Sequence, residues 1–213
     1  MATYTEVSIC NLALNEVGVN TVIAALADDT PEARACTRWY AHCRDMLMVL
    51  YPWPWALSQL TITTAATEAP IQGWEYAYGG ANSTLGAVVH RVIDIYSGAR
   101  NPLPDNRVPF AVRSEGTTSL IVYTDAYATA ADPIYFTCIV RLTDWTTYHP
   151  PPLWAEALVL LLASKLAMSL SKDRTLREEL RQRAHAAIGT AAMVLLPLDP
   201  AAEPTNAILA SRS

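Results

Sequence analysis

Charge is scarce in this chain. Only 16% of its 213 residues are charged, with 15 Lys and Arg against 20 Asp and Glu, whereas globular chains carry about 25%. No basic run occurs, and the formal net charge is −5. A grip on nucleic acid through phosphates needs clustered Lys and Arg, so the composition argues against that class of function. A chain so poor in charge is expected to bury surface in an oligomer.

Cysteine is also scarce. The four cysteines, at positions 10, 36, 43 and 138, form neither C-x-x-C pairs nor a dense framework. This argues against a disulfide-rich scaffold and fits assembly in a reducing cytoplasm. The first residues carry no charged region followed by a long apolar one, so we expect no secretory signal.

Sequence signatures of catalysis are missing as well. The chain has no phosphate loop, no G-x-G-x-x-G, no H-E-x-x-H and no G-x-S-x-G. His90 and Asp94 stand at even positions of one expected strand and could act as a base and its orienting carboxylate. No nucleophile accompanies them, so a polar strand face is favoured. We therefore predict no catalytic residue and no enzyme activity.

Binding signals are equally weak. Cys36, His42 and Cys43 lack a fourth ligand at metal-binding spacing, and both cysteines fall on an apolar stripe, so packing is favoured over a metal site. No cofactor is expected. An aromatic group could stack nucleic-acid bases, but core or interface packing is favoured in this negatively charged chain. Its members are Trp53, Trp55, Trp74, Tyr76 and Tyr78.

Helical periodicity dominates both ends of the chain. Prolines 150–152 precede a helix that is apolar on every face from Ala157 to Ala163, which is typical of a buried core helix. This apolar run is too short to span a membrane, which takes about 20 residues, so no membrane contact is expected. Leu161 should be fully buried. A second helix follows near 173–175, with Thr175 and Glu178 at capping-box spacing, and a short link makes the pair antiparallel.

The first 50 residues predict another pair of helices. Thr3 and Glu6 have capping-box spacing before a helix over about 4–17, and Gly18 stands at a left-handed C-cap. Thr30 and Pro31 announce a helix that ends before Pro52. We expect these two helices to form a second antiparallel hairpin that packs on the first.

Between the two pairs the apolar period changes to two. Strands are expected around 60–62, 88–96, 108–112 and 119–124, and the clearest runs from Ile134 to Leu142. Pro109 implies an edge strand. The predicted fold is therefore α+β: a four-helix bundle of two antiparallel hairpins, an antiparallel β insertion between helices 2 and 3, and an extended C-terminal tail. The predicted domains are 1–57 with 146–196 for the bundle, 58–145 for the β insertion and 197–213 for the tail.

Five stretches, taken together and in order, resemble one family. They are Thr5–Leu14, Glu32–Cys36 with Tyr40, Arg44 and Asp45, Tyr51–Leu57, Trp74–Tyr78 and Asp144–Leu158. Each is a packing pattern, and their order and spacing make the likeness. The chain resembles, over about residues 3–196, the head-to-tail adaptors of short-tailed bacteriophages, the tail tubular protein A or tail accessory factor family. It departs from the family after Tyr76, where relatives continue with a turn containing Leu-Pro.

The resemblance implies a structural connector in the virion. Such a protein forms a homo-oligomeric ring, expected to have twelve subunits, beneath the portal protein and carries the tail nozzle or tail fibre proteins below. DNA passes through the lumen without specific binding, and assembly takes place in the host cytoplasm. The tail is implied to bind the portal through Leu198, Pro200, Pro204, Asn206, Ile208 and Leu209.

An alternative function comes from the same family, because some members are credited with cell-wall hydrolysis. A peptidoglycan-degrading virion hydrolase would use paired carboxylates. Asp94, Asp125 and Asp144 are available, but their spacing does not single out a pair. A small-ligand module built on the aromatic residues near Trp53 is the third hypothesis.

Overall fold

The chain folds into two compact units, described here from a computed structural model. The described residues are 4–63, 73–79, 89–98, 106–115, 119–142, 145 and 149–196. The chain passes from the first unit to the second after Ala56 and returns to the first at Leu142. Within the described residues, the first unit holds the helices α1, α2, α5 and α6, and the second holds six strands.

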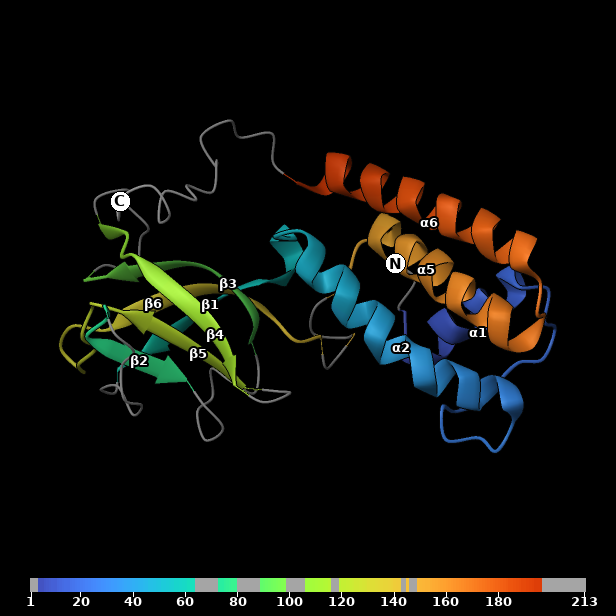
Figure 1. Ribbon diagram of the computed structural model, residues 1–213, viewed down its shortest axis with the longest axis horizontal. Helices are drawn as coiled ribbons and strands as arrows, with labels where there is room; N and C mark the ends of the chain where they lie inside the picture. Colours follow the sequence, from blue (N-terminus) through green and yellow to red (C-terminus); the bar gives the residue numbers. More distant parts are fainter. Residues whose placement is uncertain are drawn as a thin grey trace. The chain divides into compact units, whose positions relative to one another are not determined.

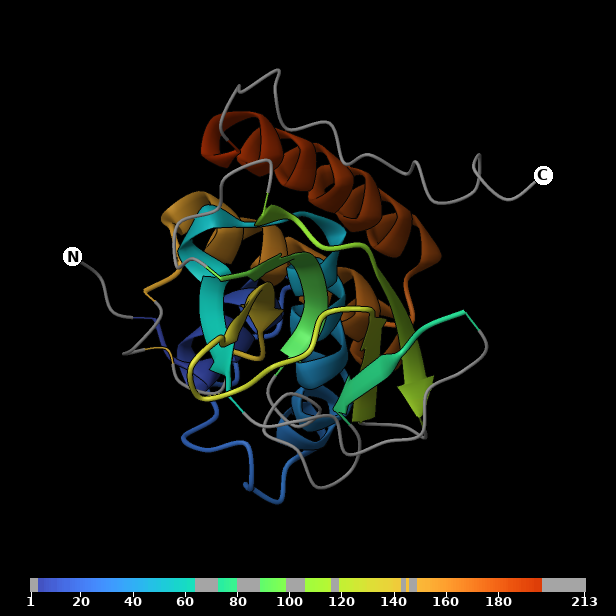
Figure 2. The ribbon, with the colours of Figure 1, turned by 90° about the vertical axis from the view of Figure 1, so that its left-hand side faces the viewer.

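The helix α5, Pro152–Leu170, is the centre of the helical unit. It packs extensively against α6, Arg174–Leu195, and the two lie side by side and antiparallel in both views (Figures 1 and 2). The helices α1, Glu6–Glu16, and α2, Pro31–Leu50, also pack against α5. As predicted, Leu161 is buried, with 6% of its surface exposed. The core of this unit is therefore built around one helix.

The predicted four-helix bundle of two hairpins, with one β insertion between helices 2 and 3, is wrong. The helices α1 and α2 scarcely contact each other, and each is held by α5 instead. The long connection from Val17 to Thr30 lets them separate, whereas only three residues join α5 to α6. The strands between α2 and α5 form two separate three-stranded antiparallel sheets. The class remains α+β with this different architecture.

The sequence signals at the helix ends predicted some capping residues correctly and others wrongly. Thr30 accepts a hydrogen bond from the Ala33 amide at 3.1 Å, as predicted for an N-cap, and Gly18 has a φ of 81°. The predicted capping box of α1 is wrong, because Thr5 and Ser8 form it. That of α6 is wrong too, since Asp173 accepts the Thr175 amide at 2.8 Å. An alternative capping residue nearby decided both cases.

The length of α5 bears on the membrane prediction. At 19 residues it is, by length and composition, the one helix among the described residues that could cross a membrane. The argument that its apolar run is too short therefore does not hold for the whole helix. However, 67% of its most apolar stretch is buried inside the protein. This burial is typical of the core helix of a soluble protein.

Two antiparallel sheets form the second unit. One has the order β1-β6-β3, with β1 Leu57–Ile62, β6 Ile134–Val140 and β3 Val89–Ser97. The other has the order β2-β5-β4, with β2 Tyr76–Gly79, β5 Ser119–Thr124 and β4 Phe110–Glu115. A short 3-10 helix, η1 Pro54–Ala56, precedes β1 in the helical unit.

The core of the β unit follows the predicted alternation in part. Ile134, Phe136 and Cys138 of the central strand β6 are fully buried, as its even-numbered pattern predicts. Ile139 is fully buried as well, so β6 is apolar on both faces there. The strand β4 lies at a sheet edge, as Pro109 predicts. The strand β2 was not predicted, and its Tyr78 ring meets Phe136 with a centroid distance of 6.1 Å.

Candidate functional site

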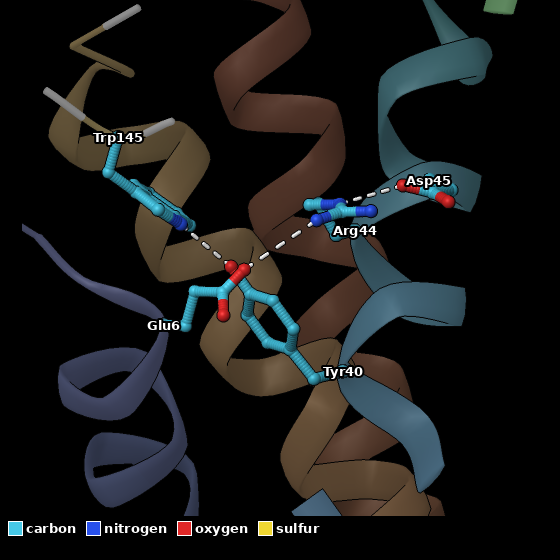
Figure 3. A network of polar contacts seen from close by, with 5 residues as sticks. All are labelled: Glu6, Tyr40, Arg44, Asp45 and Trp145. Carbon is cyan, nitrogen blue, oxygen red and sulfur yellow. Dashed lines mark hydrogen bonds and ion pairs between the residues drawn. The ribbon is translucent and has the colours of Figure 1, made fainter. Parts of the chain in front are cut away.

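A largely buried arginine side chain joins the first two helices. The side chain of Arg44 on α2 is only 11% exposed. Its Nη1 lies 3.7 Å from Glu6 Oε1 on α1, and its Nε donates to Asp45 Oδ1 at 2.7 Å (Figure 3). Two carboxylates therefore compensate one largely desolvated guanidinium. Removing both carboxylates would leave the Arg44 guanidinium without a compensating charge in a poorly solvated place.

Tyr40 connects this arginine to the chain that returns from the β unit. The Arg44 guanidinium lies over the Tyr40 ring, 5.7 Å from its centroid. The Trp145 indole Nε1 donates to the Tyr40 hydroxyl at 2.7 Å, as Figure 3 shows. Burial raises the pKa of Tyr40 well above its usual 10.0, and the nearby Glu6 carboxylate adds to the effect. The phenol therefore stays neutral and serves as a hydrogen-bond acceptor.

Tryptophans extend the contact to the start of α5. The rings of Trp145 and Trp154 lie 6.0 Å apart, and those of Trp154 and Trp55 lie 5.0 Å apart in an edge-to-face arrangement. Trp154 is fully buried. Edge-to-face aromatic pairs add about 0.5–1.5 kcal/mol beyond the area they bury. The residues that make up this arginine–tryptophan cluster are Glu6, Tyr40, Arg44, Asp45, Trp55, Trp145 and Trp154.

The contacts within the arginine–tryptophan cluster connect structural elements to one another. Both carboxylates face the guanidinium, and the phenol is occupied by the Trp145 indole. An ordinary general base needs a free lone pair directed at a substrate, and a nucleophile needs such a base beside it. This arrangement instead ties α1, α2, α5 and Trp145 to one another.

The predicted portal-binding residues lie outside the described part of the chain. This holds for all six: Leu198, Pro200, Pro204, Asn206, Ile208 and Leu209. These six residues are therefore not among those that make up the arginine–tryptophan cluster. The helix that leads to them ends at Leu195, and Met193 and Val194 near its end are 73% and 63% exposed.

The strand pair His90 and Asp94 does not form the expected face. Both lie on β3, but register shifts between Val89 and Arg91 and between Val92 and Asp94 interrupt the alternation on which the pairing depended. Asp94 Oδ2 accepts the Tyr96 hydroxyl at 2.9 Å and pairs with Arg107 Nη2 at 3.0 Å. This carboxylate therefore has structural partners.

The cysteine and histidine group on α2 is not brought together as a metal site. Cys36 and Cys43 are fully buried, whereas His42 is exposed with its ring against Trp39, at a centroid distance of 6.0 Å. Within the described residues, no group of three or more His, Cys, Asp or Glu could hold a metal ion. The packing interpretation is thus favoured for both thiols.

The aromatic group divides between the two units. The Trp53 indole donates to the Leu47 carbonyl at 2.8 Å, which ties the turn after α2 back to that helix. In the β unit, Trp74 packs against the core cluster of Ala77, Ile121 and Tyr123. These contacts favour core anchors over a surface that stacks bases, because both indoles are engaged by the protein itself.

Of the two tyrosines in this group, Tyr78 holds a loop. The Tyr78 hydroxyl donates to the Ala126 carbonyl at 2.9 Å and accepts from the Ala128 amide at 2.8 Å. Of the carboxylates considered for hydrolysis, Asp125 accepts the Glu75 amide at 3.0 Å, and Asp144 lies outside the described residues. The described carboxylates thus have local structural partners.

Sequence reasoning missed the pairing of Tyr40 with Trp145. The two residues are 105 positions apart, so no local periodicity could reveal it. Both residues do occur in stretches that carry the family resemblance, which is the one signal that pointed to them. In comparisons with known proteins, no family model matches this chain and no curated protein is significantly similar to it.

Proposed function

We propose that the protein is a structural head-to-tail connector of a phage virion. One observation supports this most: several of the residues that carry the family resemblance meet in space. Glu6, Tyr40, Arg44, Trp145 and Trp154 come from three separate stretches of sequence, yet they form one cluster. A family resemblance is stronger support when the residues that carry it pack against one another than when they are scattered over a surface.

The arginine–tryptophan cluster suits a protein that carries load. A connector between a capsid and a tail must keep its shape while it holds other proteins above and below. Charge-assisted bonds to Arg44 and edge-to-face tryptophans fix the start of α1, the middle of α2 and the start of α5 relative to one another. Binding is then the activity, and no catalytic group or cofactor is required.

Exposed apolar side chains support burial in an assembly. Large ones at more than 40% exposure occur on both units. Together with the 16% charge content, they favour surfaces that other subunits cover. They are Leu12, Val22, Leu50, Val112, Tyr127, Met193 and Val194.

The proposed partners follow from the connector role. The protein forms a homo-oligomeric ring of about twelve copies, by closed cyclic symmetry. The ring binds the portal protein above and the tail nozzle or fibre proteins below, in the virion, after assembly in the host cytoplasm. The tail from Leu198 to Leu209 follows the exposed end of α6 and supplies the portal contact. Many weak tail contacts around one ring add up through effective concentration.

The experiment tests the tail against portal rings purified from the same virus. Deletion of residues 198–213 should leave the circular dichroism spectrum unchanged and abolish co-sedimentation with the rings. In the full-length chain, replacement of Ile208 and Leu209 by Asp should have the same effect, because charged side chains cannot bury against an apolar surface. Replacement of Ser211 and Ser213 by Ala is the matched control and should bind like the parent.

Two outcomes would contradict the proposal. Stoichiometric co-sedimentation of the truncated protein would remove the tail from the portal contact. If the full-length protein fails to bind portal rings and is also absent from purified virions by mass spectrometry, the connector function itself is excluded.

A further inference from the structure

The C-terminal half of α6 presents an apolar face to solvent. From Ala186 to Leu195 the sequence contains no charged residue. Met193 and Val194 are 73% and 63% exposed. The Thr190 hydroxyl, the one polar side-chain group of this stretch, donates to the Ala186 carbonyl of its own helix at 3.0 Å. The solvent side of a helix is ordinarily charged or polar, so this surface is expected to be covered in an assembled state.

The apolar face lies on the side of α6 that points away from the helical core. Among the described residues, α5 is the one element that α6 contacts extensively. Figures 1 and 2 show α6 on the outside of the helical unit. With about 3.6 residues per turn, Ala186 and Met193 lie on the side opposite to α5, between Gly189 and Thr190. The residues that α6 buries are Leu180, Ala184, Ile188, Ala191 and Ala192.

This face is complementary to itself in shape. Met193 projects into solvent, whereas a Cβ added at Gly189 would meet nothing within 4 Å. Two copies can pack antiparallel with Gly189 and Thr190 at the crossing point. Met193 of each copy then lies over Ala186 of the other, and Thr190 lies over Gly189. Each larger side chain thus meets a small residue, which allows two helices to approach closely.

The distribution of charge favours the same partner. The exposed sides of α1, α2 and α5 carry amide or charged groups, among them Asn15, Arg38 and Glu156. Burying such groups without partners costs free energy, whereas a second copy of the α6 face brings no charge. Charge also sets the direction, because Glu179 is exposed on the same side of α6. A parallel pair would place Glu179 against its own copy, and an antiparallel pair separates the two carboxylates.

We propose that the free protein forms a symmetric, antiparallel dimer through the face made up of Ala186, Gly189, Thr190, Met193 and Val194. One pair of helices buries less area than a standard interface of roughly 1,600 Å², so the dimer is weak and depends on concentration. Neighbours in a closed cyclic ring make head-to-tail contacts, so this symmetric pair separates before a ring closes. The inference does not depend on the connector function, and either can fail without the other.

The first test measures the association of the full-length protein by sedimentation velocity from about 1 μM to about 1 mM. The parent should pass from monomer to dimer within this range and form no larger species. Met193→Lys and Gly189→Lys should raise the dissociation constant by about tenfold or more, because each brings an ammonium group into the contact. Asn15→Lys adds the same charge on the exposed side of α1 and should dimerise like the parent. Circular dichroism confirms that each variant is folded.

The second test determines the direction of the two helices by disulfide cross-linking. A mixture of Ala186→Cys protein and Met193→Cys protein should give a covalent dimer on mild oxidation. Either protein alone should not, because each new cysteine faces the other position in the antiparallel pair. The four native cysteines are buried, so the parent protein measures the background.

Four outcomes would overturn the proposal. The parent could stay monomeric at every concentration, or its dimer could be unaffected by Met193→Lys. Efficient cross-linking of either single-cysteine protein alone would show a parallel or different contact. Dimers that form only after deletion of residues 198–213 would show that the tail, and not a second copy, covers the α6 face.

Discussion

The hydroxyl of Tyr40 binds Trp145, which lies where the chain has returned from the β unit to the helical unit. Tyr40 accepts the Trp145 indole N–H at 2.7 Å, and the tyrosine is 3% exposed. A tryptophan N–H can only donate, and burying it without an acceptor costs free energy. The cost of losing this acceptor exceeds the value of an average hydrogen bond, because a desolvated donor would be left without a partner.

The first prediction follows from this bond. Tyr40→Phe should lower the free energy of unfolding by about 1–3 kcal/mol, measured by urea denaturation. Tyr51→Phe is the control, because the Tyr51 hydroxyl makes no hydrogen bond within the described residues and its ring contact with Trp53, at 5.4 Å, is kept. Equal stabilities of the two variants would show that the Trp145 bond contributes nothing.

Buried thiols make stability depend on pH in alkaline solution. Burial raises the pKa of Cys138 to about 12 from the usual 9.0. Below pH 9 this thiol is protonated in the folded and in the unfolded chain, so its contribution is fully present. Between pH 9 and 12 the unfolded thiol ionises and the folded one does not, so stability falls as pH rises.

The second prediction isolates this group. The free energy of unfolding should fall faster with pH in the parent than in Cys138→Ala, by up to about 1.4 kcal/mol per pH unit above 9. The difference between the two proteins, measured by urea denaturation at pH 8 and pH 10.5, removes the effects of other titrating groups. A constant difference at both pH values would contradict the proposed burial of the thiol.

Among the elements, the short strand β2 depends most on one residue type. Gly79 at its end has a φ of 125°, a backbone angle that residues other than glycine rarely adopt. A Cβ there would overlap the Leu120 carbonyl oxygen and lie 3.1 Å from the Ile121 Cα, both on β5. Backbone atoms of a paired strand cannot move aside cheaply. Glycine is therefore required where β2 meets β5.

The third prediction compares two glycines. Gly79→Ala should destabilise the protein by more than 2 kcal/mol, since strain and overlap act together. Gly189→Ala on α6 should stabilise it by up to about 1 kcal/mol, because nothing lies within 4 Å of the added methyl group and alanine favours helices. Thermal melting of both variants measures the contrast. A Gly79→Ala protein as stable as the parent would contradict the observed strand pairing.

At the scale of the whole molecule, the helical unit is assembled from distant parts of the chain. Its first two helices precede the β unit, and the helix that buries them follows it. The segment 1–56 thus lacks the core on which α1 and α2 pack. Contacts between positions so far apart slow folding, because the chain between them has to be ordered first.

The fourth prediction concerns the electrostatic field of the whole protein. With a formal net charge of −5, the isolated protein should show no measurable binding to duplex DNA at physiological salt, as judged by gel mobility shift. This is the behaviour proposed for the wall of a channel through which DNA passes. Binding that weakens steeply with added salt would reveal a basic surface and contradict the prediction.

Local signals in the sequence were enough for most of the elements. Thr30 and Pro31 start α2, prolines 151 and 152 start α5, and alternate apolar residues define β6, as predicted. Such features depend on hydrogen bonds and periodicity within a few residues, so they can be deduced from the sequence alone. The strand β2 was not predicted, because it has only four residues and shows no alternation of apolar and polar residues.

The tertiary structure alone decided which elements meet. Whether α1 pairs with α2 or with α5 depends on which apolar faces fit, and periodicity does not encode the partner. The meeting of Tyr40 with Trp145 likewise follows from how helices pack on α5. The sequence by itself therefore determined the elements and their apolar faces. Their partners were decided by packing, because hydrophobic burial is strong but has no direction.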